Sequence, residues 1–181
     1  MSTPGALTPT SYIVLGLLAF AGEATPYELK AGHAGSVGSF WSVPHSQLYA
    51  EPDRLAAAGL VSVRREEGGR RRKHYALTDA GREALRAWLA DAGTPPAEFR
   101  EPALLKVFFG ADPASVAPAQ LAQHRARLER YGALRAVLPP TEGPALTLDA
   151  GIEHERVWIA YWERLAGGGT GWPPDDPPGG A

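Results

Sequence analysis

The sequence of 181 residues contains no cysteine. Disulfide bonds and thiolate metal ligands are therefore excluded, and a reducing compartment is the simple expectation. No basic segment with an apolar run and a cleavage site opens the chain. The longest apolar stretch, residues 13–21, is far shorter than the roughly 20 residues that cross a bilayer. We therefore expect a cytoplasmic protein without a membrane partner.

The sequence also lacks the signatures of common enzymes. It has no G-x-S-x-G elbow, no G-x-x-x-x-G-K-[ST] phosphate loop, no H-E-x-x-H and no cysteine nucleophile. Its five histidines are scattered, without the spacing of metal ligands. We predict that the protein is not an enzyme and has no catalytic residues, metal site or cofactor.

Positive charge is concentrated in one short segment, although the formal net charge is −2. Residues 64–73 include six basic and two acidic residues, whereas residues 94–181 include 8 basic and 11 acidic ones. A basic run at a turn is usually ordinary solvated surface. Its focus on one segment instead favours a local contact with nucleic acid.

The basic segment belongs to a predicted helix and hairpin. Ser42 is the expected N-cap of the helix, and Gly59 suits a left-handed C-terminal end. Residues 60–63 and 75–77 are expected strands, joined through a turn at Gly68 and Gly69. A helix followed by a short hairpin with a cationic tip is typical of a winged helix-turn-helix.

Three further helices complete the expected N-terminal domain, residues 1–93. Thr8 and Pro9 begin the first, and Thr25 begins the second in a capping box with Glu28. Thr78 caps the last, which is expected to end at Gly93. Its apolar stripe is expected to be Leu85, Trp88 and Leu89, and the core under the third helix is expected to contain Phe40 and Trp41.

Prolines 95 and 96 mark the start of a second region, residues 94–166, with a helical pattern only. We expect helices over 99–109, 118–138 and 147–166. Residues 167–181 have no apolar pattern, and we expect a disordered tail. The predicted fold is mainly α with a small β-hairpin, a winged helix-turn-helix domain followed by an all-helical region.

The order of these elements resembles the PadR family of transcriptional regulators. The segments that carry the resemblance are VLGLL (14–18), TPYELK (25–30), FWSVPHSQLY (40–49), RLAAAGLV (54–61), GRRRKHYALTDAGREAL (69–85) and, more loosely, FREPALLKVFF (99–109). The resemblance implies a cytoplasmic repressor whose third helix enters the DNA major groove, whose wing follows the DNA backbone or minor groove, and whose C-terminal helices dimerise. Family members commonly have proline directly after the tyrosine that corresponds to Tyr49. In this sequence the proline is Pro52, and we expect it to bend the helix. Glu51 should repel phosphates.

The chemistry of these segments predicts a DNA-binding surface. Ser46 and Gln47 are short polar side chains suited to base edges, although any exposed polar residue would fit there. Tyr49 could donate to a phosphate, or it could belong to the core or to an interface. The residues expected to bind double-stranded DNA are His45, Ser46, Gln47, Tyr49, Arg70, Arg71, Arg72 and Lys73.

The C-terminal region is expected to form a homodimer and to be a possible effector region. The expected dimerisation residues are Leu105, Phe108, Leu121, Leu128, Ile152, Ile159 and Trp162. Trp88, Trp158 and Tyr161 could line a pocket for a small aromatic or phenolic effector, or they could pack within the chain or at the dimer interface.

These observations predict a sequence-specific transcriptional regulator, a ligand-responsive repressor that binds a pseudo-palindromic operator as a homodimer. Two other classes stay open. One is a winged-helix module that binds a partner protein, and the other is a small-molecule binding protein without DNA activity.

Overall fold

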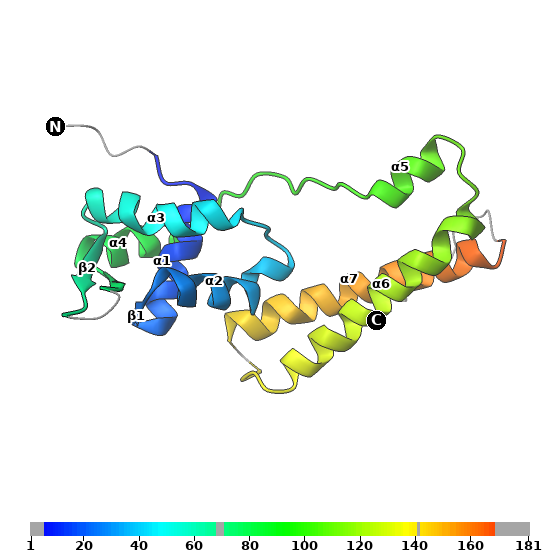
Figure 1. Ribbon diagram of the computed structural model, residues 1–181. Helices are drawn as coiled ribbons and strands as arrows, with labels where there is room; N and C mark the ends of the chain where they lie inside the picture. Colours follow the sequence, from blue (N-terminus) through cyan, green and yellow to red (C-terminus); the bar gives the residue numbers. More distant parts are fainter. Residues whose placement is uncertain (1–5, 68–70, 141, 169–181) are drawn as a thin grey trace. The chain divides into compact units, whose positions relative to one another are not determined.

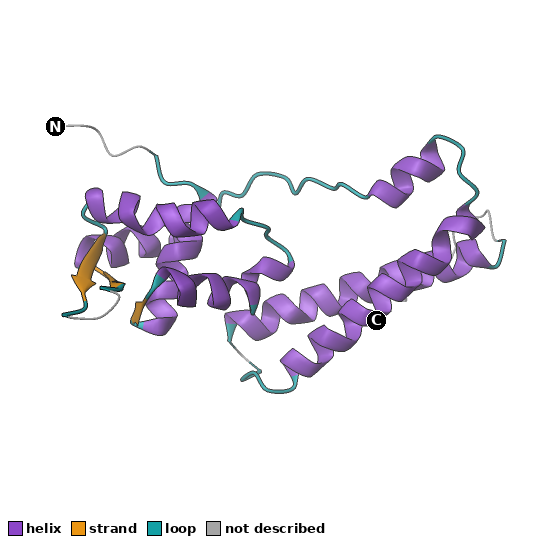
Figure 2. Ribbon diagram, in the orientation of Figure 1, coloured by secondary structure: helices purple, strands orange, loops and turns teal. Residues whose placement is uncertain are grey.

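The structure, a computed structural model, describes residues 6–67, 71–140 and 142–168. The chain divides into two compact units, residues 1–95 and 96–181. The first contains four helices and the strands of a small sheet, and the second contains helices alone among its described residues (Figures 1 and 2). The predicted fold, mainly α with a winged helix-turn-helix, is confirmed.

The helices of the first unit begin at the residues that their capping chemistry predicts. Helix α1 (Pro9–Ala21) has Thr8 as its N-cap, and α2 (Pro26–Ala34) has the capping box of Thr25 and Glu28. Helix α4 (Asp79–Ala90) begins after Thr78, whose hydroxyl accepts from the Gly81 N–H. It ends three residues before the expected Gly93.

Helix α3 (His45–Ala57) begins three residues later than expected. Its N-cap position is Pro44, and no side chain caps it, so the prediction for Ser42 was wrong. The prediction for Gly59 was right, because its φ of 76° lies in the left-handed region.

Three antiparallel strands form the sheet, in the order β1 (Glu23–Ala24), β3 (Lys73–Leu77), β2 (Val61–Arg65). The hairpin of β2 and β3 was predicted, and its turn at Gly68 and Gly69 lies outside the described residues. Strand β1 was missed, because a strand of two residues has no periodicity to detect.

The core of the first unit lies between α1, α3 and the sheet. Its buried side chains include Val14, Leu15, Leu18, Leu29, Val43, Leu48, Leu55, Val61, Tyr75, Leu77 and Leu85. Phe40 and Trp41, expected in this core, are 61% and 47% exposed. They follow a short 3-10 turn, η1 (Val37–Ser39), and Val43 is the residue of this segment that the core buries instead.

The stripe predicted for α4 is buried only at Leu85. Trp88 and Leu89 are 45% and 67% exposed. The Trp88 ring stacks on Tyr12 of α1, with ring centres 4.5 Å apart.

The second unit is a long helical hairpin with a short helix against it. Helices α6 (Pro113–Arg135) and α7 (Gly143–Ala166) run side by side, and α5 (Pro102–Phe108) packs on them through Ala103 (Figure 1). The helices were predicted, but both long ones begin earlier than expected. Asp112 caps α6, which continues through Pro118 instead of starting there. No helix in the described ranges has the length and apolar character needed to span a membrane.

Candidate nucleic-acid interface

Helix α3 exposes the four side chains that were expected to bind DNA. His45, Ser46, Gln47 and Tyr49 are all exposed, whereas Leu48 on the opposite side is fully buried. Tyr49 is 43% exposed, so it is not a core tyrosine. No side chain of the described residues caps the first turn of α3. The Gln47 and Leu48 N–H groups donate to the Pro44 carbonyl, which leaves those of His45 and Ser46 for a ligand.

Neither Pro52 nor Glu51 disturbs this face. Helix α3 continues through Pro52, which is fully buried on the core side. Glu51 is turned toward α1, where the Arg54 guanidinium donates to its two oxygens over 2.9 and 2.5 Å, and Arg54 also donates to Ser11 Oγ. Burial opposes ionisation of Glu51, but the hydrogen bonds outweigh it and hold its pKa below 4.5. The expected repulsion of phosphates by Glu51 is thus compensated by Arg54.

The basic residues of the hairpin divide into paired and unpaired ones. Arg70 lies outside the described residues. Arg71 and Arg72 are exposed, and neither forms an ion pair with any residue in the described ranges. Arg71 also has a left-handed backbone, with φ of 46°, which residues other than glycine rarely adopt. These two guanidinium groups are free for phosphates.

Lys73 was expected to neutralise a phosphate, but its ammonium group is already bound to Asp53 of α3. The Nζ atom donates to both carboxylate oxygens over 2.8 and 2.7 Å, and the Tyr75 hydroxyl donates to Oδ1 over 2.9 Å. The hydrogen bonds from Lys73 lower the pKa of Asp53, against the effect of burial. Burial, together with this carboxylate, raises the pKa of Tyr75.

The other side of the hairpin is paired as well. Arg64 donates to both oxygens of Glu23 on β1 over 3.0 and 2.7 Å, which lowers the pKa of Glu23. A ring nitrogen of His74, Nε2, lies 2.9 Å from Glu66 Oε1. Arg64 and His74 therefore stabilise the hairpin itself.

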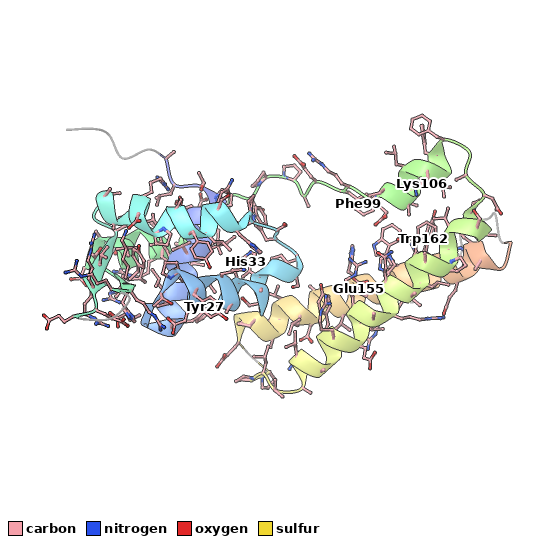
Figure 3. The ribbon with its side chains drawn as sticks, in the orientation of Figure 1. Tyr27, His33, Phe99, Lys106, Glu155 and Trp162 are labelled. Atoms are coloured by element: carbon pink, nitrogen blue, oxygen red, sulfur yellow. The ribbon has the colours of Figure 1, made fainter. Side chains whose placement is uncertain are left out.

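A groove of about 660 Å³ lies beside Arg72. It is lined from three elements: the start of α2, the middle of α3 and the beginning of β3. Its lining residues are Thr25, Pro26, Tyr27, Glu28, Tyr49, Arg72 and Lys73. Tyr27, labelled in Figure 3, is 71% exposed and brings a second phenol to the groove. Sequence reasoning missed it, although an aromatic residue in the first turn of a polar helix was an available signal.

The residues expected at a dimer interface lie in different environments. Leu105 and Phe108 of α5 are 59% and 81% exposed. The half-buried ones are Leu121, Leu128, Ile152 and Ile159. Trp162 is fully buried in its own unit, with Ala103 and Ala117 in the same core, so it has no surface left for a partner (Figure 3).

The residues suggested for an effector pocket come from both units. Trp158 and Tyr161 are half-buried neighbours in the second unit, with ring centres 5.5 Å apart. The Trp158 ring also stacks on Phe99 and His124. Trp88 belongs to the first unit, where it stacks on Tyr12.

A buried polar cluster between α6 and α7 was not predicted. Nδ1 of His124 lies 2.6 Å from Glu155 Oε2, and Arg127 Nε lies 3.4 Å from Glu155 Oε1. Both side chains of the His124–Glu155 pair are at least 95% buried. Within the described part of the chain, His124 Nε2 and Trp162 Nε1 are buried without a hydrogen-bond partner. The residues lie 31 positions apart, so no local pattern could reveal them.

Comparisons with known proteins agree with this geometry. Residues 14–87 match the Transcriptional regulator PadR-like family, and residues 99–167 match the family Virulence activator alpha C-term. The Negative transcriptional regulator PadR of Bacillus subtilis is 28% identical over 171 residues, which cover 85% of this chain and 93% of that protein.

Solved structures give the same result. The crystal structure of Bacillus subtilis PadR in complex with operator DNA has a TM-score of 0.76 and 27% identity, and the match covers 90% of this chain and 98% of that one. The structure of the same protein with p-coumaric acid has a TM-score of 0.70 at 23% identity, over 92% of this chain and all of that one. The winged-helix unit is thus a PadR-like domain, and the matches together support a DNA-binding transcriptional regulator of that family.

Proposed function

We propose that the protein is a homodimeric repressor that binds a pseudo-palindromic operator through α3 and the wing, the hairpin of β2 and β3. The single observation that carries this proposal is that α3 exposes His45, Ser46, Gln47 and Tyr49 while Arg72, which forms no ion pair among the described residues, lines one groove with Tyr49. Bacillus subtilis PadR, which is described as a negative regulator and binds operator DNA, supports the repressor role.

The two elements divide the recognition between them. Ser46 and Gln47 are short polar side chains on the first turn of α3, where a helix in the major groove presents its N-terminal residues to base edges. Tyr27 and Tyr49 offer hydroxyl donors from two helices, and Arg72 offers a guanidinium between them. Phosphate contacts from these groups would fix the register of the protein on the duplex.

The apolar surface of the second unit supports a homodimer. Phe108, Phe109 and Val157 are 81%, 77% and 68% exposed. A protein that leaves such side chains in water usually covers them with a partner. A two-fold dimer would place its two α3 helices one DNA turn apart, about 34–36 Å.

The aromatic side chains of the second unit support a small-molecule effector. Bacillus subtilis PadR has been crystallised with p-coumaric acid, a phenolic acid. In this chain Trp158 and Tyr161, half-buried neighbours in the second unit, would give aromatic contacts to a compound of that class. Titration of the operator complex with phenolic acids should release the DNA, and operator affinity that no such acid changes would remove support for ligand control.

The function of the surface can be tested with a pair of matched variants. We expect Arg71→Ala/Arg72→Ala to bind the DNA upstream of its own gene more weakly, with a salt slope smaller by about two, because each phosphate contact contributes about 0.9. Arg125→Ala/Arg156→Ala removes the same charge from exposed ion pairs of the second unit. It should leave both affinity and slope unchanged in a fluorescence anisotropy titration.

Two results would contradict this function. If both double variants bound DNA like the wild type, the basic hairpin would be incidental and the protein-interaction module would be favoured. If neither variant nor the wild type bound any DNA, but Trp158 fluorescence still responded to phenolic acids, the small-molecule binding protein would be favoured.

A further inference from the structure

We infer that Asp53 is a positioning residue that sets the gap between the recognition helix and the wing, and that Lys73 serves this carboxylate instead of a phosphate. This inference rests on the proposed role of α3 and the wing in DNA binding. It adds an acidic residue on the DNA-facing side as a determinant of operator specificity.

The positions of the bonded residues give Asp53 this role. Asp53 follows Tyr49 by one helical turn, so both lie on the same face of α3. Lys73 directly follows Arg72 in the chain, at the start of β3. The two hydrogen bonds from Lys73 Nζ to Asp53, 2.8 and 2.7 Å long, therefore fix the separation of Tyr49 and Arg72, which both line the groove.

Tyr75 is a second hydrogen-bond donor to the Asp53 carboxylate, from the core side. Its side chain is 1% exposed and belongs to the core, while its hydroxyl donates to Asp53 Oδ1 over 2.9 Å. Lys73 and Tyr75 stand two residues apart on β3, on the same face of the strand. The carboxylate thus accepts from two points of one strand, so both its position and its orientation are set.

The remaining bonds of the hairpin leave Asp53 as its link to α3. Arg64 binds Glu23 of β1, and His74 binds Glu66 within the hairpin. No other side-chain hydrogen bond or ion pair joins the wing to α3 in the part of the chain that the structure describes. Loss of the Asp53 carboxylate should therefore free the wing to move relative to α3.

The direction in which Asp53→Asn changes operator affinity distinguishes a positioning role from a purely electrostatic one. Asp53→Asn removes a negative charge near DNA and releases the Lys73 ammonium. If charge alone mattered, operator binding would become tighter and more salt-dependent. If Asp53 positions the wing, operator binding becomes weaker, whereas binding to random DNA, which needs no defined spacing, is unchanged or tighter.

The experiment is an anisotropy titration of the full-length protein on an operator duplex and on a random duplex of equal length, at several salt concentrations. We expect Asp53→Asn and Lys73→Met each to lower the ratio of operator to random affinity by about tenfold, with the salt slope on operator unchanged. The double variant should lose no more than either single one, because both remove one interaction. Lys73→Arg, which can still bind the carboxylate in bidentate form, should keep the ratio of the wild type.

Arg72→Ala is the matched control, since it removes the neighbouring positive charge from a side chain that forms no ion pair with a described residue. It should lower the salt slope by about one and weaken operator and random binding alike. Thermal unfolding of all variants shows whether they are folded. Exposed ion pairs contribute little to folding, so Lys73→Met should keep the thermal transition of the wild type.

Two results would overturn the inference while leaving the DNA-binding surface intact. One is tighter operator binding by Asp53→Asn, and the other is a salt slope of operator binding that falls for Lys73→Met as it does for Arg72→Ala. A wild type without preference for operator over random DNA would overturn both the inference and the proposed function.

Discussion

The contact between α4 and the sheet depends on Gly81, and its replacement by alanine should destabilise the winged-helix unit. A Cβ atom at Gly81 would lie 2.0 Å from the Leu60 carbonyl oxygen, whereas real Cβ contacts are essentially never shorter than 3.0 Å. The same oxygen accepts from the Thr78 N–H over 3.1 Å, and the Thr78 hydroxyl donates to the Gly59 carbonyl over 2.8 Å. Two bonds therefore hold α4 where the new methyl group would need space.

The magnitude follows from two opposing effects. Alanine is favoured over glycine in a helix by at most about 1 kcal/mol. Overpacking against a fixed backbone costs about 1–3 kcal/mol and occasionally more, and an overlap of this size belongs at the upper end. We expect a net loss of about 1–2 kcal/mol in the free energy of unfolding, and each kcal/mol should lower the Tm by about 4–8 °C for a unit of this size.

Gly16→Ala is the matched control, because a Cβ at Gly16 of α1 would meet nothing within 4 Å. Thermal unfolding followed by circular dichroism should show a Tm at or above that of the wild type for Gly16→Ala and a lower Tm for Gly81→Ala. A Gly81→Ala protein as stable as Gly16→Ala would refute the reasoning about the Leu60 contact.

Three further predictions follow from particular side chains. Glu155→Gln should destabilise the second unit by about 1–3 kcal/mol in denaturant unfolding, because it weakens the buried contacts of this carboxylate with His124 and Arg127. The exposed Glu153→Gln should have little effect, and equal effects would contradict the burial argument. Tyr27→Phe and Tyr49→Phe should each weaken operator binding in anisotropy titrations without changing the Tm, and unchanged affinity would exclude hydroxyl contacts with phosphates. The pKa of Glu51 is held below its ordinary value in the folded protein. The stability that the Glu51 carboxylate contributes is therefore present at neutral pH and is lost as the pH falls through its pKa in the folded protein. An acid-unfolding curve of Glu51→Gln that matches the wild type would contradict this.

The sequence predicts the elements whose signals are local. Thr8, Thr25 and Thr78 each begin a helix because a hydroxyl can accept from N–H groups only two or three residues away. Gly59 follows the end of α3 because glycine adopts the left-handed backbone conformation of that position without a steric penalty. The order of caps, stops and alternating strands is enough to predict the winged helix and its position in the chain.

The errors concern properties that depend on distant residues. Phe40 and Trp41 are exposed because Val43 is the residue of this segment that is buried in the core. No pattern in the sequence distinguishes Val43 from its two aromatic neighbours. Pro118 looks like a helix start, but the Asp112 cap begins α6 earlier, and an exposed proline is tolerated in the helix. Lys73 belongs to a basic run in the sequence, yet its partner lies 20 positions away on another element.

The same limit applies to the candidate site. The exposure of His45, Ser46, Gln47 and Tyr49 follows from helical periodicity, because the buried Leu48 and Leu55 define the other face. Which arginines are free follows only from the folded structure, because Arg64 and Glu23 meet through the sheet. Charge counts alone therefore overestimate the number of residues available to phosphates.

Footprinting of the protein on the DNA upstream of its own gene tests most directly whether α3 and the wing of a homodimer read an operator. We predict two symmetric protected patches whose centres are one DNA turn, about 10–10.5 base pairs, or a small multiple of it apart. Arg71→Ala/Arg72→Ala should lose both patches together at the protein concentration that saturates the wild type. A single unsymmetric patch, or two patches that this double variant retains, would contradict the assignment of the surface.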